Sequence, residues 1–382
     1  MEFDAATPDG LAEFRRALRE WLDDNLAPEV VSAGWEGFED EGTLEVLRRW
    51  NRALADARWA AVAWPEEYLG RDATVAQQLA YHEVMAEAEA PGPINVIGVS
   101  NIAPAILEVG TQAQKDRFLL PMLRGDEIWS QGMSEPDAGS DLASLRTSAV
   151  VDGEEFVVNG AKTWNSLGQY ADWCQLYVRT DAAAPKHKGI SCLLVDMKTP
   201  GIEVRPLRTM TGEVTFSEIF LTDVRVPASS LLGPLDEGWK VAMTTLSHER
   251  AGVAKFHLSL SARFADLMDE TRRSGVQVTP VDRDRLARLY SKIACLRWST
   301  ARELEEVGRG GRPSPTVGSM AKLMWAEISQ ELAGLAVGLL GPAALEGRWS
   351  ERLCASPGSS IAGGTSEINR NIVAEHGLGL PR

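Results

Sequence analysis

The sequence has little cysteine and little histidine, and it has no long apolar run. Among its 382 residues are five histidines without a metal-like spacing and four cysteines that form no C-x-x-C pair, at Cys174, Cys192, Cys295 and Cys354. This scarcity argues against a disulfide scaffold and against a metal site, and it favours reduced core thiols in a cytoplasmic protein. No stretch approaches the roughly 18 uninterrupted apolar residues of a membrane span, and the acidic N-terminus lacks a signal-peptide pattern.

Basic residues are also fewer than acidic residues. There are 39 Lys and Arg against 54 Asp and Glu, which gives a formal net charge of −15. This balance argues against a nucleic-acid binder, which needs a basic face. It does not exclude a phosphate-bearing ligand, because local arginines and helix N-termini can outweigh the overall charge.

The periodicity of apolar residues divides the chain into three regions. Residues 1–125 repeat apolar side chains at three- and four-residue spacing, which predicts an N-terminal helical bundle. Residues 126–233 contain short apolar runs between turn residues, which predicts a β-barrel or sandwich. Helical spacing returns over residues 234–382 and predicts a C-terminal four-helix bundle. We therefore expect an α+β multidomain fold with these three domains.

Individual elements follow from the same patterns. Pro28, Gly34, Gly37 and Gly42 should separate the first two helices. Further helices are expected at 74–89, 94–109, 111–123, 241–270, 282–307, 314–340, 348–356 and 365–375. Thr111 and Gln114 have the spacing of a capping box. Strands are expected at 149–158 (a hairpin turning at Asp152-Gly153), 173–178, 190–195, 202–207 and 214–220.

A polar segment follows a predicted strand end at Ile128-Trp129. It reads Gln131-Gly-Met-Ser-Glu-Pro-Asp-Ala-Gly-Ser-Asp141. Proline fixes φ and glycine permits positive φ, so this corner should present backbone N–H groups and a hydroxyl outward. Such donors suit a flat polar ring or a phosphate. The alternative is an ordinary surface turn rich in Asp and Ser.

Five segments in order resemble the motifs of the acyl-CoA dehydrogenase family. The segment 131–141 is similar to its T-E-P-x-A-G-S-D motif, Trp64-Pro65-Glu66 to W-P-x-E, and residues 159–166 to N-G-x-K-x-W-I-T/S. Residues 223–227 match D-V-x-V-P, and 363–368 resemble the E/G-G-T-x-E/Q-I signature. The resemblance implies a helix–sheet–helix fold, FAD as cofactor, and an oxidoreductase acting on the CH–CH group of an acyl-CoA thioester in lipid metabolism. It further implies that an electron-transfer flavoprotein reoxidises the flavin.

The resemblance also assigns the cofactor contacts. It implies FAD contacts at Gln131, Met133, Ser134, Gly139, Ser140, Trp164, Ser166, Thr365 and Glu367. Three of these residues have a simpler structural explanation. Trp164 could be a core aromatic, since the chain has 12 Trp. Thr365 could simply be a helix N-cap with Glu367 in the first turn, and this role is compatible with cofactor binding.

The catalytic base is where the chain departs from many relatives. Those relatives carry the base glutamate at the position of Gly363, whereas a second group carries it on a helix just before an arginine. This chain has His248-Glu249-Arg250 at that place. Glu249 has no basic residue three or four positions away, which suits a perturbed carboxylate facing a pocket. We predict Glu249 as the base; the alternative is a solvated glutamate at the edge of the bundle.

The resemblance implies four substrate contacts. Ser140 would face the thioester or the pantetheine, and Arg250 would help to order the substrate side; the alternative for Arg250 is an ion pair between helices or subunits. The backbone of Gly363 or Gly364 would polarise the thioester carbonyl.

Further departures concern the oligomer. The Arg-x-x-Phe pair that relatives give to a neighbouring subunit's FAD is lost in residues 272–279, and the usual Gly-Gly-x-Gly turn reads Leu340-Gly-Pro-Ala343. Residues 210–213 and 377–382 resemble an actinobacterial subgroup, some members of which act on bulky, branched or sterol side-chain thioesters, sometimes as mixed-subunit tetramers. We expect a homotetramer or heterotetramer. The alternative functions are a non-catalytic partner subunit and a flavin oxidase or monooxygenase; the acyl chain and the choice between CoA and a carrier protein stay open.

Overall fold

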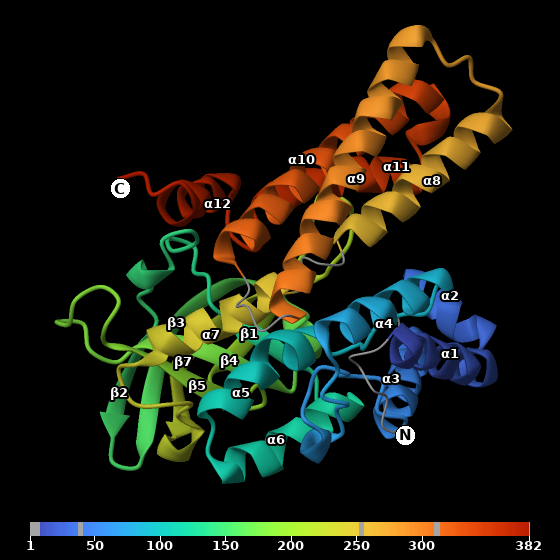
Figure 1. Cartoon of the computed structure of the whole chain (residues 1–382). Coiled ribbons are helices and arrows are strands. Elements are labelled where there is room, and N and C mark those ends of the chain that lie inside the picture. Colours follow the sequence, from blue (N-terminus) through green and yellow to red (C-terminus); the bar gives the residue numbers. More distant parts are fainter. Residues whose placement is uncertain (1–7, 37–40, 252–255, 309–313, 382) are drawn as a thin grey trace. The chain divides into compact units, whose positions relative to one another are not determined.

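The computed structural model describes residues 8–36, 41–251, 256–308 and 314–381 (Figure 1). The chain forms two compact units, which are described separately below. The first unit comprises residues 1–73 and 84–248, and the second comprises residues 74–83 and 249–382. Within the helix Gly238–Ala251, the side chains of residues 247–251 lie outside the described part.

Helices form the N-terminal region, as predicted. They are α1 (Pro8–Asn25), α2 (Pro28–Glu36), α3 (Glu41–Asp56), α4 (Val75–Glu87), a π-helix (Gly98–Ile102), α5 (Ala103–Val109) and α6 (Gln112–Arg124). The stretch from Pro28 to Gly42, expected to separate two helices, also contains the additional helix α2, which begins at Pro28. Proline is well tolerated in the first turn, where its missing N–H has no helical partner. The capping box is confirmed: Thr111 accepts a hydrogen bond from the Gln114 amide, and the Gln114 side chain accepts one from the Thr111 amide.

A buried asparagine joins these helices to the first strand. The side-chain amide of Asn95 donates to the carbonyls of Met122 (3.0 Å) and Glu127 (2.9 Å). Its oxygen accepts from the backbone amide of Trp129 (2.9 Å). The end of α6 and the start of the sheet are therefore held together by one side chain.

The middle region is a curled seven-stranded sheet. Its strands are β1 (Trp129–Gly132), β2 (Ser148–Asp152), β3 (Glu155–Ser166), β4 (Trp173–Arg179), β5 (Ile190–Asp196), β6 (Ile202–Leu207) and β7 (Phe216–Pro227). Their order is β1-β4-β2-β3-β7-β6, and β5 pairs with β4. The predicted hairpin of β2 and β3 is confirmed, with Gly153 at a φ of 64° in its turn. β7 is longer than predicted and includes the D-V-x-V-P segment.

One apolar cluster fills the inside of this sheet. It consists of Ala149, Phe156, Val158, Cys174, Leu176, Val178, Leu193, Val195, Ile219, Leu221, Val224 and Val226. These residues alternate along their strands with residues of the opposite face, except between Leu221 and Val224, where the pairing of β7 with β3 shifts register. The helix α7 (Gly238–Ala251) follows the sheet.

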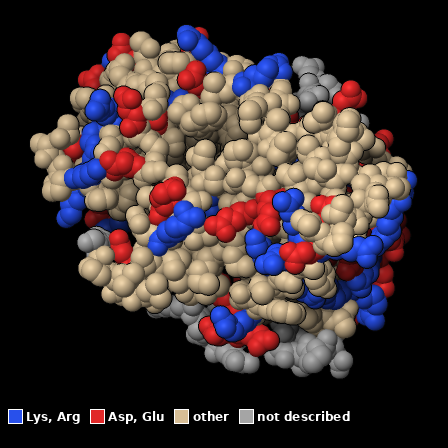
Figure 2. Space-filling model, turned by 90° about the horizontal axis from the view of Figure 1, so that it is seen from above, with Lys and Arg blue, Asp and Glu red and all other residues tan. Residues whose placement is uncertain are grey.

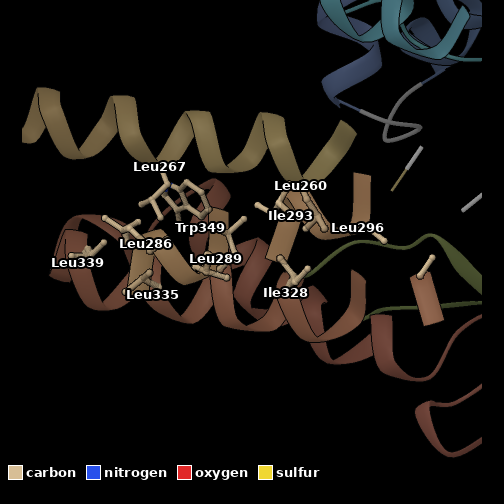
Figure 3. Packing of buried hydrophobic residues seen from close by; sticks show 14 residues of the cluster. Leu260, Leu267, Leu286, Leu289, Ile293, Leu296, Ile328, Leu335, Leu339 and Trp349 are labelled. Carbon is tan, nitrogen blue, oxygen red and sulfur yellow. The ribbon is translucent and has the colours of Figure 1, made fainter. Parts of the chain in front are cut away.

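The C-terminal region is helical, with α8 (Phe256–Ser274), α9 (Pro280–Gly308), α10 (Pro315–Leu340), α11 (Arg348–Ala355) and α12 (Ser366–Ile372). The range predicted as one helix, 241–270, holds parts of α7 and α8. Figure 3 shows the second unit's core, where Leu267 from α8, Leu289 from α9 and Leu335 from α10 pack with Trp349 from α11. The fold class is thus confirmed; the boundaries at residues 126 and 234 stay a prediction.

Helix α10 is rich in apolar residues. Within the described residues, one helical stretch, Thr316–Ala344, is long and apolar enough to cross a membrane by length and composition. The same composition is found in core helices. Three of its side chains, Ile328, Leu335 and Leu339, belong to the core cluster of Figure 3, and this packing accounts for the apolar composition.

Charges and cysteines complete the description. Acidic and basic side chains are interspersed over the face shown in Figure 2. None of the four cysteines, all of them in the described part of the chain, forms a disulfide. Cys174 and Cys192 are buried, whereas Cys295 is exposed and Cys354 is half-buried, so the expectation of core thiols holds for only two of them.

Candidate functional site

The end of β1 and the end of β3 lie side by side in the first unit. The Thr163 amide donates to the carbonyl of Ser134 (2.9 Å), and the Ser130 hydroxyl donates to the carbonyl of Ser166 (2.8 Å). The Asn165 side chain donates to the carbonyl of Gln131 (2.7 Å). These bonds bring five predicted cofactor contacts, at positions 131, 133, 134, 164 and 166, onto two adjacent segments.

A bulge in β3 turns Trp164 outward. Lys162 pairs with Ile219 and Asn165 with Ser217, so two residues of β3 oppose one residue of β7. Trp164 has a φ of 62° and is 62% exposed, and its ring meets the Phe216 ring edge-on at 5.9 Å between centroids. The alternative of a core aromatic is therefore wrong. A non-glycine residue in the left-handed region costs about 1–3 kcal/mol, and such strain is common at binding sites.

A buried ion pair supports the loop after β1. The Glu135 carboxylate accepts from Lys162 Nζ (2.9 Å) and from the amides of Arg146 (2.6 Å) and Thr147 (2.8 Å). Lys162, which is fully buried, also donates to the carbonyl of Met133 (3.2 Å). Burial alone would raise the pKa of Glu135, but Lys162 and the amide donors together hold this pKa below its usual value. Burial lowers the pKa of Lys162, against the opposing effect of Glu135.

The corner after Glu135 is a tight exposed turn. Glu135 and Ala138 exchange backbone hydrogen bonds of 3.0 and 3.1 Å. Gly139 and Ser140 are exposed, and Lys186 pairs with Asp141 at 2.6 Å. The expected positive φ is not found at Gly139, and a Cβ there would meet no atom within 4 Å. Neither backbone conformation nor packing within the described residues requires glycine at this position.

Asn165 stands where the family motif has isoleucine. Its side chain is fully buried, and within the described part of the chain its Oδ1 has no hydrogen-bond partner. A buried acceptor of this kind is rare, because leaving it unpaired costs about 1–3 kcal/mol. The exposed ring of Trp164 and the half-buried Ser166 two residues further on offer an aromatic surface and a hydroxyl to a flat ring. The residues present are thus compatible with a flavin.

The second unit contains the remaining cofactor and glycine positions. Gly363 and Gly364 have consecutive positive φ values of 67° and 88°, which strongly favour glycine at both positions. Thr365 caps α12, and its hydroxyl accepts from the Ile368 amide (3.2 Å). Glu367 is exposed in the first turn and pairs with Arg370 at 3.6 Å. The N-cap reading of Thr365 is confirmed, and it is compatible with a cofactor role.

Two central predictions fall on undescribed side chains. Glu249 and Arg250 belong to the backbone of α7, but their side chains lie outside the described residues. Their roles as base and substrate contact therefore stay predictions.

Three polar residues of the first unit were missed as parts of the site. The carboxylate of Glu135 and the ammonium of Lys162 lie within segments already recognised as motifs, yet a sequence does not show that they pair. Gln175 is fully buried in β4. A glutamine between Cys174 and Leu176 in a buried strand is the signal that could have found it.

Each of the three regions matches a domain model of one known protein family. Residues 8–126 match the model of the acyl-CoA dehydrogenase N-terminal domain, 130–224 the middle domain, and 236–378 the C-terminal domain. The helices, sheet and helices thus define the three-domain class of acyl-CoA oxidoreductases.

Individual relatives are similar to this chain over nearly its whole length. The chain is 36% identical to acyl-CoA dehydrogenase IpdE1 of Mycobacterium tuberculosis, covering 97% of this chain and 98% of that protein. The solved Tcur3481-Tcur3483 steroid ACAD is 31% identical, with a TM-score of 0.87, covering 99% of this chain and 100% of that one. The ChsE4-ChsE5 complex from Mycobacterium tuberculosis is 32% identical, with a TM-score of 0.82 and 98% of each chain covered. The chain belongs to the acyl-CoA dehydrogenase family, whose members are FAD-dependent oxidoreductases acting on a CH–CH group.

Proposed function

We propose that this protein binds FAD and converts an acyl-CoA thioester to its trans-2-enoyl-CoA. The observation that carries the proposal is the strained, exposed Trp164 on the β3 bulge, beside Ser166 and the end of β1. When bound, FAD supplies a ring that accepts the hydride leaving Cβ. Trp164 would cover an edge of that ring, and the Ser166 hydroxyl would donate a hydrogen bond to it. Backbone groups at positions 131–134 would hold its pyrimidine edge.

Glu249 would take the proton from Cα. Thr245 lies one turn earlier on α7, where it is fully buried and hydrogen-bonded to β4. Position 249 follows Thr245 by four residues along the backbone of α7. A carboxylate in a partly buried setting has a raised pKa, which suits it to abstract a weakly acidic proton.

Donors to the thioester oxygen would stabilise charge as the α-proton leaves. We assign this role to the amide of Gly363 or Gly364, where no side chain blocks the acyl group. Ser140 and Arg250 would hold the thioester. Thr365 and Glu367 would contact the dinucleotide portion of FAD.

The proposals for the substrate and the partners are based mainly on the similarity to known relatives. Likeness to a steroid ACAD and to IpdE1 supports a fatty-acyl or sterol-derived thioester. The net charge of −15 disfavours an acidic carrier protein, which supports CoA. We propose an electron-transfer flavoprotein as acceptor, and a homotetramer or heterotetramer, since one relative is a complex of two named chains.

A thioester panel tests this function. The chain, purified alone and with added FAD, is mixed anaerobically with short-chain, long-chain, branched and sterol-like CoA thioesters, and flavin bleaching is recorded. Bleaching by at least one thioester, with slow reoxidation in air, is expected. A colourless protein that FAD does not restore would indicate a partner subunit, and rapid peroxide release in air would indicate an oxidase; either result overturns the proposal.

Replacing the base is the sharpest single change. We expect Glu249→Gln to bind FAD normally and to bleach roughly 10²- to 10⁴-fold more slowly, the usual contribution of an acid–base residue. The matched control is Glu237→Gln, an exposed carboxylate that pairs with Lys240 at 2.7 Å just before α7. Bleaching of Glu249→Gln at the wild-type rate would place the base elsewhere.

A further inference from the structure

A chain of hydrogen-bonded side chains runs from the end of β1 to α7. Gln131 Nε2 donates to Gln175 Oε1 (3.2 Å), and Gln175 Nε2 donates to Thr245 Oγ1 (3.3 Å). The hydroxyl of Tyr177 bonds to the same Thr245 oxygen at 3.2 Å. We call these four residues the Gln–Thr chain. All of them belong to the first unit.

The Gln–Thr chain occupies the face of β4 opposite the sheet's core. Cys174 and Leu176 belong to the apolar cluster inside the sheet, so Gln175 and Tyr177 point the other way. Gln175, Tyr177 and Thr245 are all fully buried. Burial raises the pKa of Tyr177 well above its usual value, so its phenol stays neutral and able to donate.

Polar groups at this interface restrict how α7 can sit on the sheet. Leucine, phenylalanine and valine would fill similar volumes and would tolerate a helix that slides or rotates slightly. The two hydrogen bonds that join β4 to α7 form only when Thr245 Oγ1 lies within hydrogen-bond distance of both Gln175 Nε2 and the Tyr177 hydroxyl. Buried polar networks of this kind add specificity of position more than stability.

The buried positions on α7 show which side of the helix is fixed. Val241, Ala242 and Thr245 are buried, and they lie on one side of the helix at spacings of three and four residues. One more turn along that side leads to position 249. A rotation of α7 about its axis would therefore redirect the residue at this position.

We propose that Thr245 is a positioning residue for the dehydrogenation. Its hydroxyl, held by Gln175 and Tyr177, fixes the rotation of α7, and through Gln175 it ties that rotation to Gln131 on the strand that carries the flavin contacts. This inference rests on the proposed function, in which Glu249 is the base. Misplacing a reacting group by about 1 Å can cost roughly 10²-fold in rate, so a single hydroxyl at this interface has a measurable kinetic effect.

The test compares Thr245→Val, which removes the hydroxyl at nearly constant volume, with Thr245→Ser, which keeps it. We expect Thr245→Val to lower the limiting bleaching rate roughly 10- to 100-fold while FAD affinity stays within about twofold. Thr245→Ser should stay within about threefold of wild type. Independently of activity, amide hydrogen exchange of apo Thr245→Val should be faster in α7 than that of Thr245→Ser. The control is Thr300→Val, a buried helical threonine whose hydroxyl bonds to its own helix at Leu296.

Tyr177→Phe provides a second variant if Thr245→Val does not fold. It keeps the ring and removes one bond of the Gln–Thr chain, so it should lower the bleaching rate less, but in the same direction. The inference is overturned if these variants bleach at the wild-type rate, or if the rate falls only in proportion to FAD affinity. A wild-type protein that no thioester bleaches would overturn the proposed function and, with it, this inference.

Discussion

The sheet region and the C-terminal helices use buried polar side chains in different ways. In the sheet region these side chains bond across segments: Lys162 of β3 holds Glu135 after β1, and Gln175 of β4 holds Thr245 of α7. In the helices, Thr271 and Thr300 bond to carbonyls one turn back on their own helix, whereas buried Lys322 of α10 donates to the carbonyl of Ser359 (2.7 Å). Cross-linking fixes the position of one segment against another, whereas back-bonding only satisfies a buried hydroxyl. The sheet region thus joins its loop after β1 and α7 to the strands through polar side chains, whereas the cluster of Figure 3 is built from apolar side chains.

The largest expected effect comes from breaking the buried ion pair of the sheet region. Lys162→Met leaves the Glu135 carboxylate buried without its cation, which should cost about 3–5 kcal/mol of unfolding free energy. FAD affinity should also fall, because Lys162 Nζ supports the carbonyl of Met133. Denaturant unfolding and fluorescence titration with FAD measure the two effects.

An exposed lysine provides the control for this change. Lys240 pairs with Glu237, but its side chain is 75% exposed, so Lys240→Met should change stability by less than about 1 kcal/mol. If both lysine variants have equal stability, the buried pair is not a cross-link, and the comparison between the two regions fails.

A slightly smaller effect is expected in the core of the second unit. Leu289 of α9 is fully buried in the cluster of Figure 3. Leu289→Ala should cost about 2–5 kcal/mol through the lost burial and the cavity left behind. Leu289 packs only in the apolar cluster of the second unit and not beside the proposed flavin contacts of β1 and β3. FAD affinity should therefore stay at its wild-type value. A loss of FAD affinity as large as that of Lys162→Met would contradict the comparison. Leu353→Ala, at a partly exposed position of α11, is the control and should cost less than Leu289→Ala.

The fold was largely predictable from local signals. β6 was expected at residues 202–207 and is found there, because an alternating run between turn residues specifies a strand without help from distant residues. The capping box of Thr111 and Gln114 is equally local. The helix α2 was missed because proline and glycine were read only as breakers, although Pro28 starts the helix. Propensity alone does not distinguish a proline that ends one helix from a proline that begins the next.

The site was predictable in its residue types but not in its geometry. Motif spacing identified Trp164, yet its exposure depends on a register shift between β3 and β7, which are joined only through pairing of distant segments. Likewise, Gln175 and Thr245 are 70 residues apart and meet only when α7 packs on the sheet. Cross-segment contacts of this kind are set by tertiary packing, so no local pattern reveals them.

The smallest expected effect on stability, and the most specific for the site, comes from Trp164. Asparagine tolerates the left-handed conformation, so Trp164→Asn should change unfolding free energy by less than about 1 kcal/mol. Loss of the ring should weaken FAD binding roughly 10-fold, since a well-placed aromatic contact contributes about 0.5–1.5 kcal/mol. Trp298 of α9 is exposed to a similar extent, at 67% against 62%. Trp298→Asn should therefore match Trp164→Asn in stability and leave FAD affinity unchanged. If both variants lose FAD affinity equally, the effect comes from removing any exposed tryptophan and not from the position of Trp164 on the β3 bulge. That result would contradict the assignment of the cofactor site to the sheet region.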